Sequence, residues 1–67
     1  MIGITVNGAR HALENPLSIR GLLEQLEMAG KKVAVERNGE IVPRSLHAGT
    51  LVEDGDALEI VVAVGGG

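Results

Sequence analysis

The end of the chain carries the group whose chemistry is easiest to name, a carboxylate that follows three successive glycines, Gly65-Gly66-Gly67. Glycine has no Cβ and adopts nearly any backbone dihedral, so this segment is slender enough to thread into a closed active site. An α-carboxyl group with a usual pKa of ~3.3–3.7 is ionised at neutral pH, and an anion is a poor target for a nucleophile. The carboxylate would need activation, as in an acyl-adenylate. The alternative is a frayed terminus, which is the usual meaning of terminal glycines.

The sequence indicates no active site of the chain's own. No Gly-rich loop with a lysine lies between a strand and a helix, so the chain has no candidate ATP site and another protein would have to activate the carboxylate. Ser18 is explained as a helix N-cap rather than a nucleophile. His11 and His47 are too far apart to suggest a ligand pair and are expected at the surface. We therefore assign no catalytic residue, no metal ligand and no bound cofactor.

Composition and charge narrow the class of protein. The 67 residues fit one domain over 1–64 with a flexible tail over 65–67, and the absence of Cys fits a reducing compartment. Nine acidic and six scattered basic residues give a net charge of −3, and aromatic residues are absent, so nucleic-acid binding is disfavoured and a basic partner surface fits better. Neither a signal pattern nor the ~20 apolar residues of a membrane helix is present. We expect a cytoplasmic protein that is monomeric when free.

The first half of the chain predicts a β-hairpin followed by one helix. Apolar residues alternate over 2–6, Asn7-Gly8 is typical of a tight turn, and a second strand is expected over 10–14. Ser18 is expected to cap a helix whose apolar residues recur at the i, i+3, i+4 and i+7 positions of one face. Gly30 is expected to end this helix in a left-handed conformation.

The second half predicts a second hairpin and a long apolar strand. A strand at 33–35, an Asn38-Gly39 turn and a short strand at 40–42 come first. The last strand, over 57–64, is apolar on both faces, which indicates a central position protected on both sides. The helix between the hairpins requires a crossover, so an antiparallel meander is excluded. The order predicts an α+β fold, the ubiquitin-like β-grasp, with a mixed four- to five-stranded sheet packed on one main helix.

The irregular segment 43–56 is expected to cover the core and then to turn into the last strand. Leu46, Leu51 and Val52 are its candidates for burial. Residues 53–56, Glu-Asp-Gly-Asp, are typical of a turn. The ligand alternation and closing Glu of a calcium loop are missing, so a calcium site is not expected there.

Several segments together resemble one family. Residues 33–44 (VAVERNGEIVPR), the 53–56 turn, Leu58-Glu59-Ile60 and the terminal Gly-Gly, in this order and spacing, are similar to the thiamine-biosynthesis sulfur carrier proteins, the ThiS family. The resemblance implies that the Gly67 carboxylate is adenylated by an enzyme related to those that activate ubiquitin, and is then converted to a thiocarboxylate. It further implies that Gly65 and Gly66 thread into the partner's active site, although the family's defining end is Gly-Gly and Gly65 is additional.

The resemblance also implies partners and competing functions. The chain would be a carrier rather than an enzyme, and its partners would be the adenylating enzyme, which uses ATP, thiazole synthase, and a sulfur donor such as a cysteine desulfurase or sulfurtransferase. Arg37 and Arg44, with exposed parts of the last strand, are our candidates for partner contacts. The alternatives are the small subunit of molybdopterin synthase, which is usually longer and richer in aromatic residues, a ubiquitin-like protein modifier, and a β-grasp interaction module with an inert tail.

Overall fold

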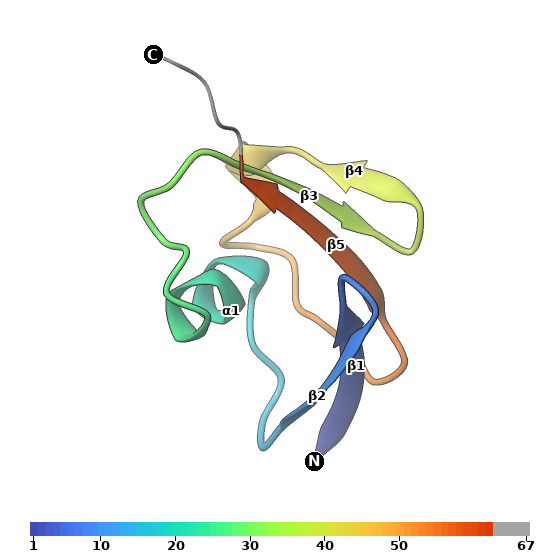
Figure 1. Ribbon diagram of the computed structural model, residues 1–67. Helices are drawn as coiled ribbons and strands as arrows, with labels where there is room; N and C mark the ends of the chain where they lie inside the picture. Colours follow the sequence, from blue (N-terminus) through green and yellow to red (C-terminus); the bar gives the residue numbers. More distant parts are fainter. Residues whose placement is uncertain (63–67) are drawn as a thin grey trace.

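Two hairpins and a helical crossover arrange this chain as a mixed sheet with one helix against one face (Figure 1). The computed structural model describes residues 1–62. The elements, in order, are β1 (Ile2–Val6), β2 (Ala9–Leu13), α1 (Ile19–Gln25), β3 (Val33–Arg37), β4 (Glu40–Val42), a 3-10 helix η1 (Arg44–Leu46) and β5 (Ala57–Val62). The predicted element order and the β-grasp fold are confirmed.

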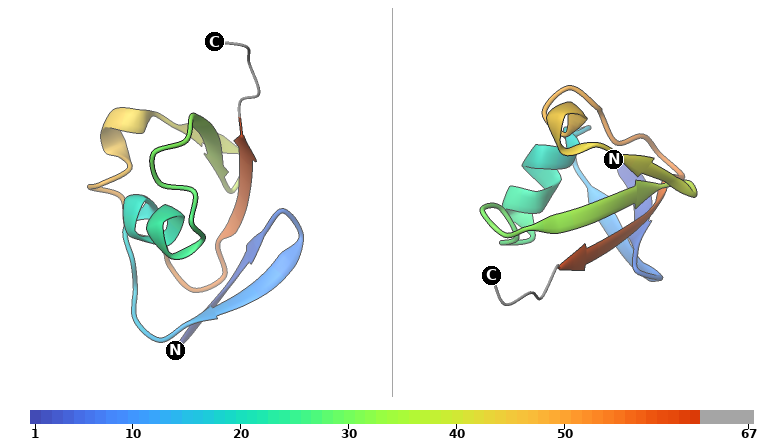
Figure 2. Two further views of the ribbon diagram at one scale, coloured as in Figure 1. Left: turned by 60° about the vertical axis from the view of Figure 1, so that its left-hand side comes forward. Right: turned by 90° about the horizontal axis from the view of Figure 1, so that it is seen from above.

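The sheet has the strand order β2-β1-β5-β3-β4, with β5 in the centre (Figure 2). β1 and β5 are parallel, whereas every other neighbouring pair is antiparallel. β2 and β3, which precede and follow α1, run in the same direction, as the predicted crossover requires. Asn7 and Asn38 adopt φ values of 51° and are followed by glycines with φ of 83° and 87°, which is the two-residue left-handed geometry expected of tight hairpin turns.

The start of α1 agrees with the prediction, but its end does not. The Ser18 hydroxyl accepts a hydrogen bond from the backbone N–H of Gly21 at 3.0 Å. Gly30 is left-handed as predicted, with φ of 87°, but the helix has already ended at Gln25, because Glu27 takes the left-handed conformation that closes it, with φ of 61°. The Met28 N–H donates to Leu23 O at 2.7 Å, which is the closing bond of a Schellman motif. A left-handed Glu is uncommon because its Cβ crowds the backbone, and the sequence gives no sign of it.

The core lies between α1 and the inner face of the sheet and is entirely aliphatic. It consists of Ile4, Val6, Leu13, Ile19, Leu22, Leu23, Val35, Val52, Leu58 and Ile60, all buried. Leu26 and Met28 pack against this cluster while partly exposed. The alternation of apolar residues along the strands and their helical spacing in α1 therefore select the same side of each element.

Four residues differ in burial from the prediction. Leu46 and Leu51 are 52% and 58% exposed, and only Val52 of the irregular segment reaches the core. His47, expected at the surface, is buried, and its Nε2 lies 3.0 Å from Val42 O, so the ring N–H donates to that carbonyl. β5 is central as predicted, but Val61 is 60% exposed because α1 covers only one face of the sheet. The residues expected beyond Val62 in this strand lie outside the described part of the chain.

The turn that begins β5 is attached to both halves of the sheet. On one side, Gly3 donates to the Asp54 carboxylate at 2.7 Å and accepts from the Gly55 N–H at 2.7 Å. On the other side, the carboxylate of Asp56 accepts from Arg37 Nε at 2.7 Å and from Asn38 Nδ2 at 3.0 Å. This turn therefore joins β1 to the β3–β4 hairpin, as well as starting β5.

Asp56 is buried and ionised. Burial alone would raise the pKa of its carboxyl group, but hydrogen bonds from the backbone N–H of Glu53, from Arg37 and from Asn38 stabilise the anion and hold the pKa below its usual 3.8. A carboxyl group whose pKa is lower in the folded state stabilises the fold above its unfolded-state pKa, and this contribution disappears as the pH falls through the folded-state pKa.

We predict that acid unfolds the chain partly through Asp56. The free energy of unfolding should be highest above about pH 5 and should fall as the pH drops below 3.8. Asp56→Asn should lower it by about 1–3 kcal/mol at pH 7, because a buried charged hydrogen-bond network loses its anion, and should flatten its decline in acid. Urea unfolding across pH measures both effects. The exposed Glu14→Gln is the matched control, and an equal effect in this control would contradict the prediction.

Candidate functional site

The predicted reactive residues lie outside the described part of the chain. Gly65, Gly66 and Gly67 follow β5, and the structure describes residues 1–62. It thus describes the strand that leads toward the tail, together with the surfaces around the end of that strand. These surfaces are the features that a partner enzyme would meet on the folded body.

The pairing of β5 changes along its length. β1 pairs with β5 only at Ala57 and Leu58. β3, in contrast, pairs with it from Leu58 to Val62, where the partner residue is Val33. The last residues of β5 therefore have a neighbouring strand on one edge only. An edge of this kind is where an extended partner segment can add by backbone hydrogen bonding.

The side chain of Asn7 replaces β1 where that strand turns away. Its Nδ2 donates to Ile60 O at 3.0 Å, and its Oδ1 accepts from the Ile60 N–H at 2.8 Å. The amide thus satisfies both backbone groups of Ile60, as one further residue pair of the sheet would. β5 is held on both edges as far as Ile60, and on one edge beyond it.

The outer face of the sheet, opposite α1, carries an exposed apolar and acidic surface. Ile41 and Val61 are 63% and 60% exposed. Glu36 is the register partner of both Ile41 and Glu59, so the four side chains share one face. We call Glu36, Ile41, Glu59 and Val61 the outer sheet patch. Glu36 and Glu59 are directly opposite one another, and their carboxylates repel. These two carboxylates give the patch negative charge beside its apolar side chains.

The structure places Arg37 and Arg44 in different surroundings. Arg37 bonds to Asp56 and, at 3.1 Å, to Glu53. The hydrogen bond to Asp56 is the main reason why the pKa of Arg37 is raised above its usual value. Arg44 is exposed on η1. Arg37 has a structural role in joining the hairpin to β5, and the role of either residue in partner contacts stays a prediction.

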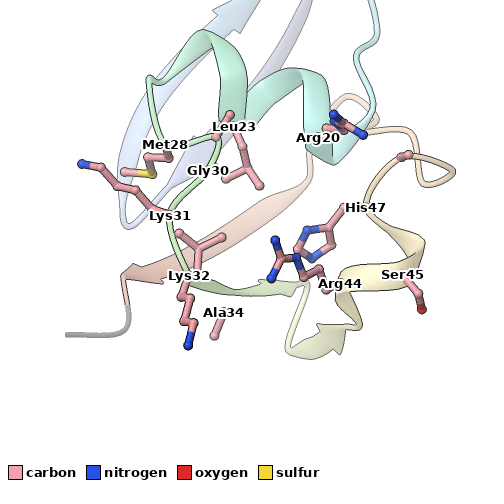
Figure 3. A pocket seen from close by; sticks show the side chains of 13 residues that line it. Arg20, Leu23, Met28, Gly30, Lys31, Lys32, Ala34, Arg44, Ser45 and His47 are labelled. Carbon is pink, nitrogen blue, oxygen red and sulfur yellow. The ribbon is translucent and has the colours of Figure 1, made fainter. Parts of the chain in front are cut away.

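A cleft of about 600 Å³ lies between η1 and the connection from α1 to β3 (Figure 3). Its charged and titratable lining residues are all basic: Arg20, Lys31, Lys32, Arg44 and His47. We call these five residues and their apolar floor the basic cleft. The adjacent lysines after the helix are a signal that the sequence contains. Their convergence with η1 depends on the fold, and sequence reasoning missed it.

Residues 1–62 contain neither a group of metal ligands nor a membrane-spanning helix. No three His, Cys, Asp or Glu residues are grouped as metal ligands. No helix in this part of the chain has the length and apolar character needed to cross a membrane.

Residues 4–67 match the ThiS family. A thiazole synthase of Paramagnetospirillum magneticum is 45% identical over 64 residues, which are 96% of this chain, and the chain spans 20% of that protein's length. An uncharacterized protein ycf40 of Porphyra purpurea is 36% identical over 66 residues, covering 98% of this chain and 93% of the relative. The match thus includes both a segment of a larger protein and a small protein of similar length.

The fold is also similar to that of a solved structure. The crystal structure of the thiamine biosynthesis protein ThiS from Geobacter metallireducens has 38% sequence identity and a TM-score of 0.84. The comparison covers 98% of this chain and 100% of that chain. The likeness therefore extends over the whole β-grasp rather than over one motif.

We predict that Asn7 protects the backbone of β5 ahead of the tail. Asn7→Gly keeps a residue that tolerates the left-handed φ but removes both hydrogen bonds to Ile60. Losing them should cost about 1–2 kcal/mol locally, which corresponds to roughly tenfold faster hydrogen exchange of the Ile60 amide. Amide exchange measured by NMR tests this. The amides of β3 are the control, and an equal acceleration in β3 would mean global destabilisation instead.

Proposed function

Because this chain belongs to the ThiS family, we propose that it is a sulfur carrier for thiamine biosynthesis whose working group is the carboxylate of Gly67. The observation that carries this proposal is the whole-chain likeness to a ThiS protein at 38% identity. In this proposal the chain is a co-substrate of partner enzymes, and its folded body presents the tail to them.

The chemistry that we propose needs two steps at the terminal carbonyl. A partner enzyme joins a carboxylate oxygen of Gly67 to the α-phosphorus of ATP, and pyrophosphate leaves. The resulting acyl-adenylate is an activated carbonyl, unlike the free anion. A persulfide of a donor such as a cysteine desulfurase or sulfurtransferase then attacks the carbonyl, and AMP leaves as the acyl–sulfur bond forms. A thiol of the partner enzymes cleaves the remaining S–S bond and forms a disulfide with the donor cysteine, which releases the thiocarboxylate. No residue of the chain has to act as an acid, base or nucleophile in these steps.

The folded body supports the proposal by offering binding energy beside the tail. Fixing one residue's backbone costs roughly 1–2 kcal/mol, so capture of Gly65, Gly66 and Gly67 needs compensation from other contacts. Burying an exposed Val side chain contributes about 1.5–3 kcal/mol. Val61, on the outer sheet patch, belongs to the central strand and precedes the tail by only a few residues. The outer sheet patch is our first candidate for the docking surface.

Thiazole synthase is the partner that the comparisons support. In the relative from Paramagnetospirillum magneticum, the matched segment is one fifth of a protein named thiazole synthase. A second thiazole synthase, from Magnetococcus marinus, is 39% identical over 64 residues and is matched over the same fraction of its length. A carrier segment joined to the enzyme that consumes its sulfur would have a high effective concentration for it. We propose that this chain delivers its sulfur to a thiazole synthase.

We predict that removing Gly66 and Gly67 abolishes sulfur loading while leaving the fold intact. Both residues lie beyond β5, and the core is built from residues 4–60. Intact-mass spectrometry after incubation with the adenylating enzyme, ATP and a sulfur donor should show one oxygen exchanged for sulfur in the full chain and no exchange in the truncated chain. Circular dichroism should show equal unfolding temperatures.

Two outcomes would overturn the proposed function. The first is sulfur loading of the truncated chain, or its absence from the full chain. The second is a mature cellular protein whose mass includes residues after Gly67. Conjugates to lysines of other proteins, without a thiocarboxylate, would favour a protein modifier instead.

We predict that Val61→Asp weakens adenylation by impairing docking. The substitution removes an exposed apolar contact and adds a third carboxylate to the outer sheet patch, so the KM for the chain should rise by about tenfold with little change in kcat. ATP–pyrophosphate exchange measures both constants. Leu51→Asp is the matched control, because Leu51 is 58% exposed and lies outside the sheet. An equal rise in KM for this control would contradict a specific role for the patch.

A further inference from the structure

The fold concentrates positive charge in one place on a chain that is acidic overall. The sequence has six Lys and Arg residues and a net charge of −3. Four of the six, Arg20, Lys31, Lys32 and Arg44, line the basic cleft, and no Asp or Glu lines it. These four come from α1, from the connection after it and from η1. Residues far apart in the sequence therefore form one cationic surface, which favours contact with an anionic group.

The cationic side chains of the basic cleft make few ion pairs within residues 1–62. Arg20 Nε lies 3.9 Å from Glu24 Oε2, and both side chains are more than half exposed. An exposed ion pair of this kind contributes little to the free energy of folding. Arg37, in contrast, is fully engaged by Asp56 and Glu53 and lies outside the cleft. Lys31, Lys32 and Arg44 are exposed. Their charge is consequently available to a ligand.

The floor of the basic cleft is apolar, which limits the kind of anion that fits. Leu23 and Met28 line it, beside Val33 at the start of β3. The Schellman bond from Met28 to Leu23 fixes the first two of these next to one another. Lys31 and Lys32 lie at the rim of this floor on the side of the α1–β3 connection, with their amines directed outward, and Arg44 lies on the side of η1 (Figure 3). The combination suits a segment that presents carboxylates on both sides of an apolar side chain.

The cleft also adjoins the strand that leads to the tail. Val33, which lines the cleft, is the register partner of Val62, the last residue of β5. Neighbouring strands lie about 5 Å apart, so a protein that receives the tail can reach the rim of the cleft at the same time. The exposed position of Lys31, Lys32 and Arg44 favours such a protein surface over a small molecule enclosed in a pocket.

We propose that the basic cleft docks an acidic segment of thiazole synthase that rests an apolar side chain on the floor of the cleft beside Met28. This inference rests on the proposed function, because that function supplies the partner. It assigns opposite charges to two surfaces of one small domain: the outer sheet patch suits a basic surface, and the basic cleft suits an acidic one. The cleft would hold the body of the carrier while the tail occupies the active site.

The test is the affinity of the unmodified full chain for the thiazole synthase of the same organism, measured by isothermal titration calorimetry. Lys32→Glu and Arg44→Glu should each raise Kd by roughly tenfold, because they place a like charge against the acidic segment. The wild-type Kd should also rise steeply with salt. Arg10→Glu is the matched control, with the same change in net charge on β2, at the other edge of the sheet. Its Kd should stay within about twofold of wild type.

A second measurement locates the contact and identifies the class of ligand. A short peptide of alternating Asp, Leu and Glu should shift the NMR amide signals of Leu23, Lys32 and Ala48 in the ¹⁵N-labelled chain, and its Asn/Leu/Gln counterpart should not. Phenyl phosphate is the third probe. Stronger shifts of these signals by phenyl phosphate than by the acidic peptide would overturn the proposal in favour of a small phosphorylated ligand.

The outcomes for docking and for sulfur loading are separate. Equal Kd values for Lys32→Glu, Arg10→Glu and wild type would overturn the docking site even if the wild-type chain forms a thiocarboxylate. Absence of wild-type binding to thiazole synthase would do the same. If the wild-type chain does not load sulfur but the cleft variants lose affinity as predicted, the proposed chemistry is wrong. The docking site is then retained.

Discussion

The hydrogen bonds that fix the start of β5 determine where the end of this strand lies. Asp56 is buried and anionic, and it holds Arg37 and Asn38 of the β3–β4 hairpin, while Asp54 holds Gly3 of β1. A strand fixed at its first residue has its register fixed along its whole length, because a shift of one residue would move every side chain to the other face. The position of the central strand, and hence the point from which the tail departs, follows from these few contacts.

Much of the fold could be predicted from the sequence because its signals are local. The Asn-Gly turns, the Ser18 cap and the alternating strands each depend on neighbouring residues, and all agree with the structure. The end of α1 was predicted too late, because Gly30 is left-handed as expected but Glu27 adopts that conformation three residues earlier and closes the helix. His47 was misplaced for a different reason: its burial depends on the carbonyl of Val42, a contact set by the path of the chain after β4.

The candidate site likewise has one part that local sequence signals reveal and one part that depends on the fold. The terminal glycines are visible in the sequence because their chemistry depends on residue type and position alone. The basic cleft is not, since its cationic residues come from α1, from the following connection and from η1, and only the fold brings them together. The net charge of −3 indicates an acidic protein. A sum of charges over all residues does not show where in space those charges lie. A protein of this size can therefore present opposite charges to different partners.

The left-handed Glu27 also has a consequence for motion. A non-glycine residue in this conformation costs roughly 1–2 kcal/mol, which the short helix must offset through packing. Within residues 1–62, the backbone hydrogen bond that the connection 29–32 donates is that of Lys31, to Met28 O at 3.2 Å. Few hydrogen bonds within residues 1–62 hold the connection from α1 to β3, so we expect it to open locally at a lower free energy than the sheet. Local opening of the α1–β3 connection would let its surface adapt to a bound protein without moving β5.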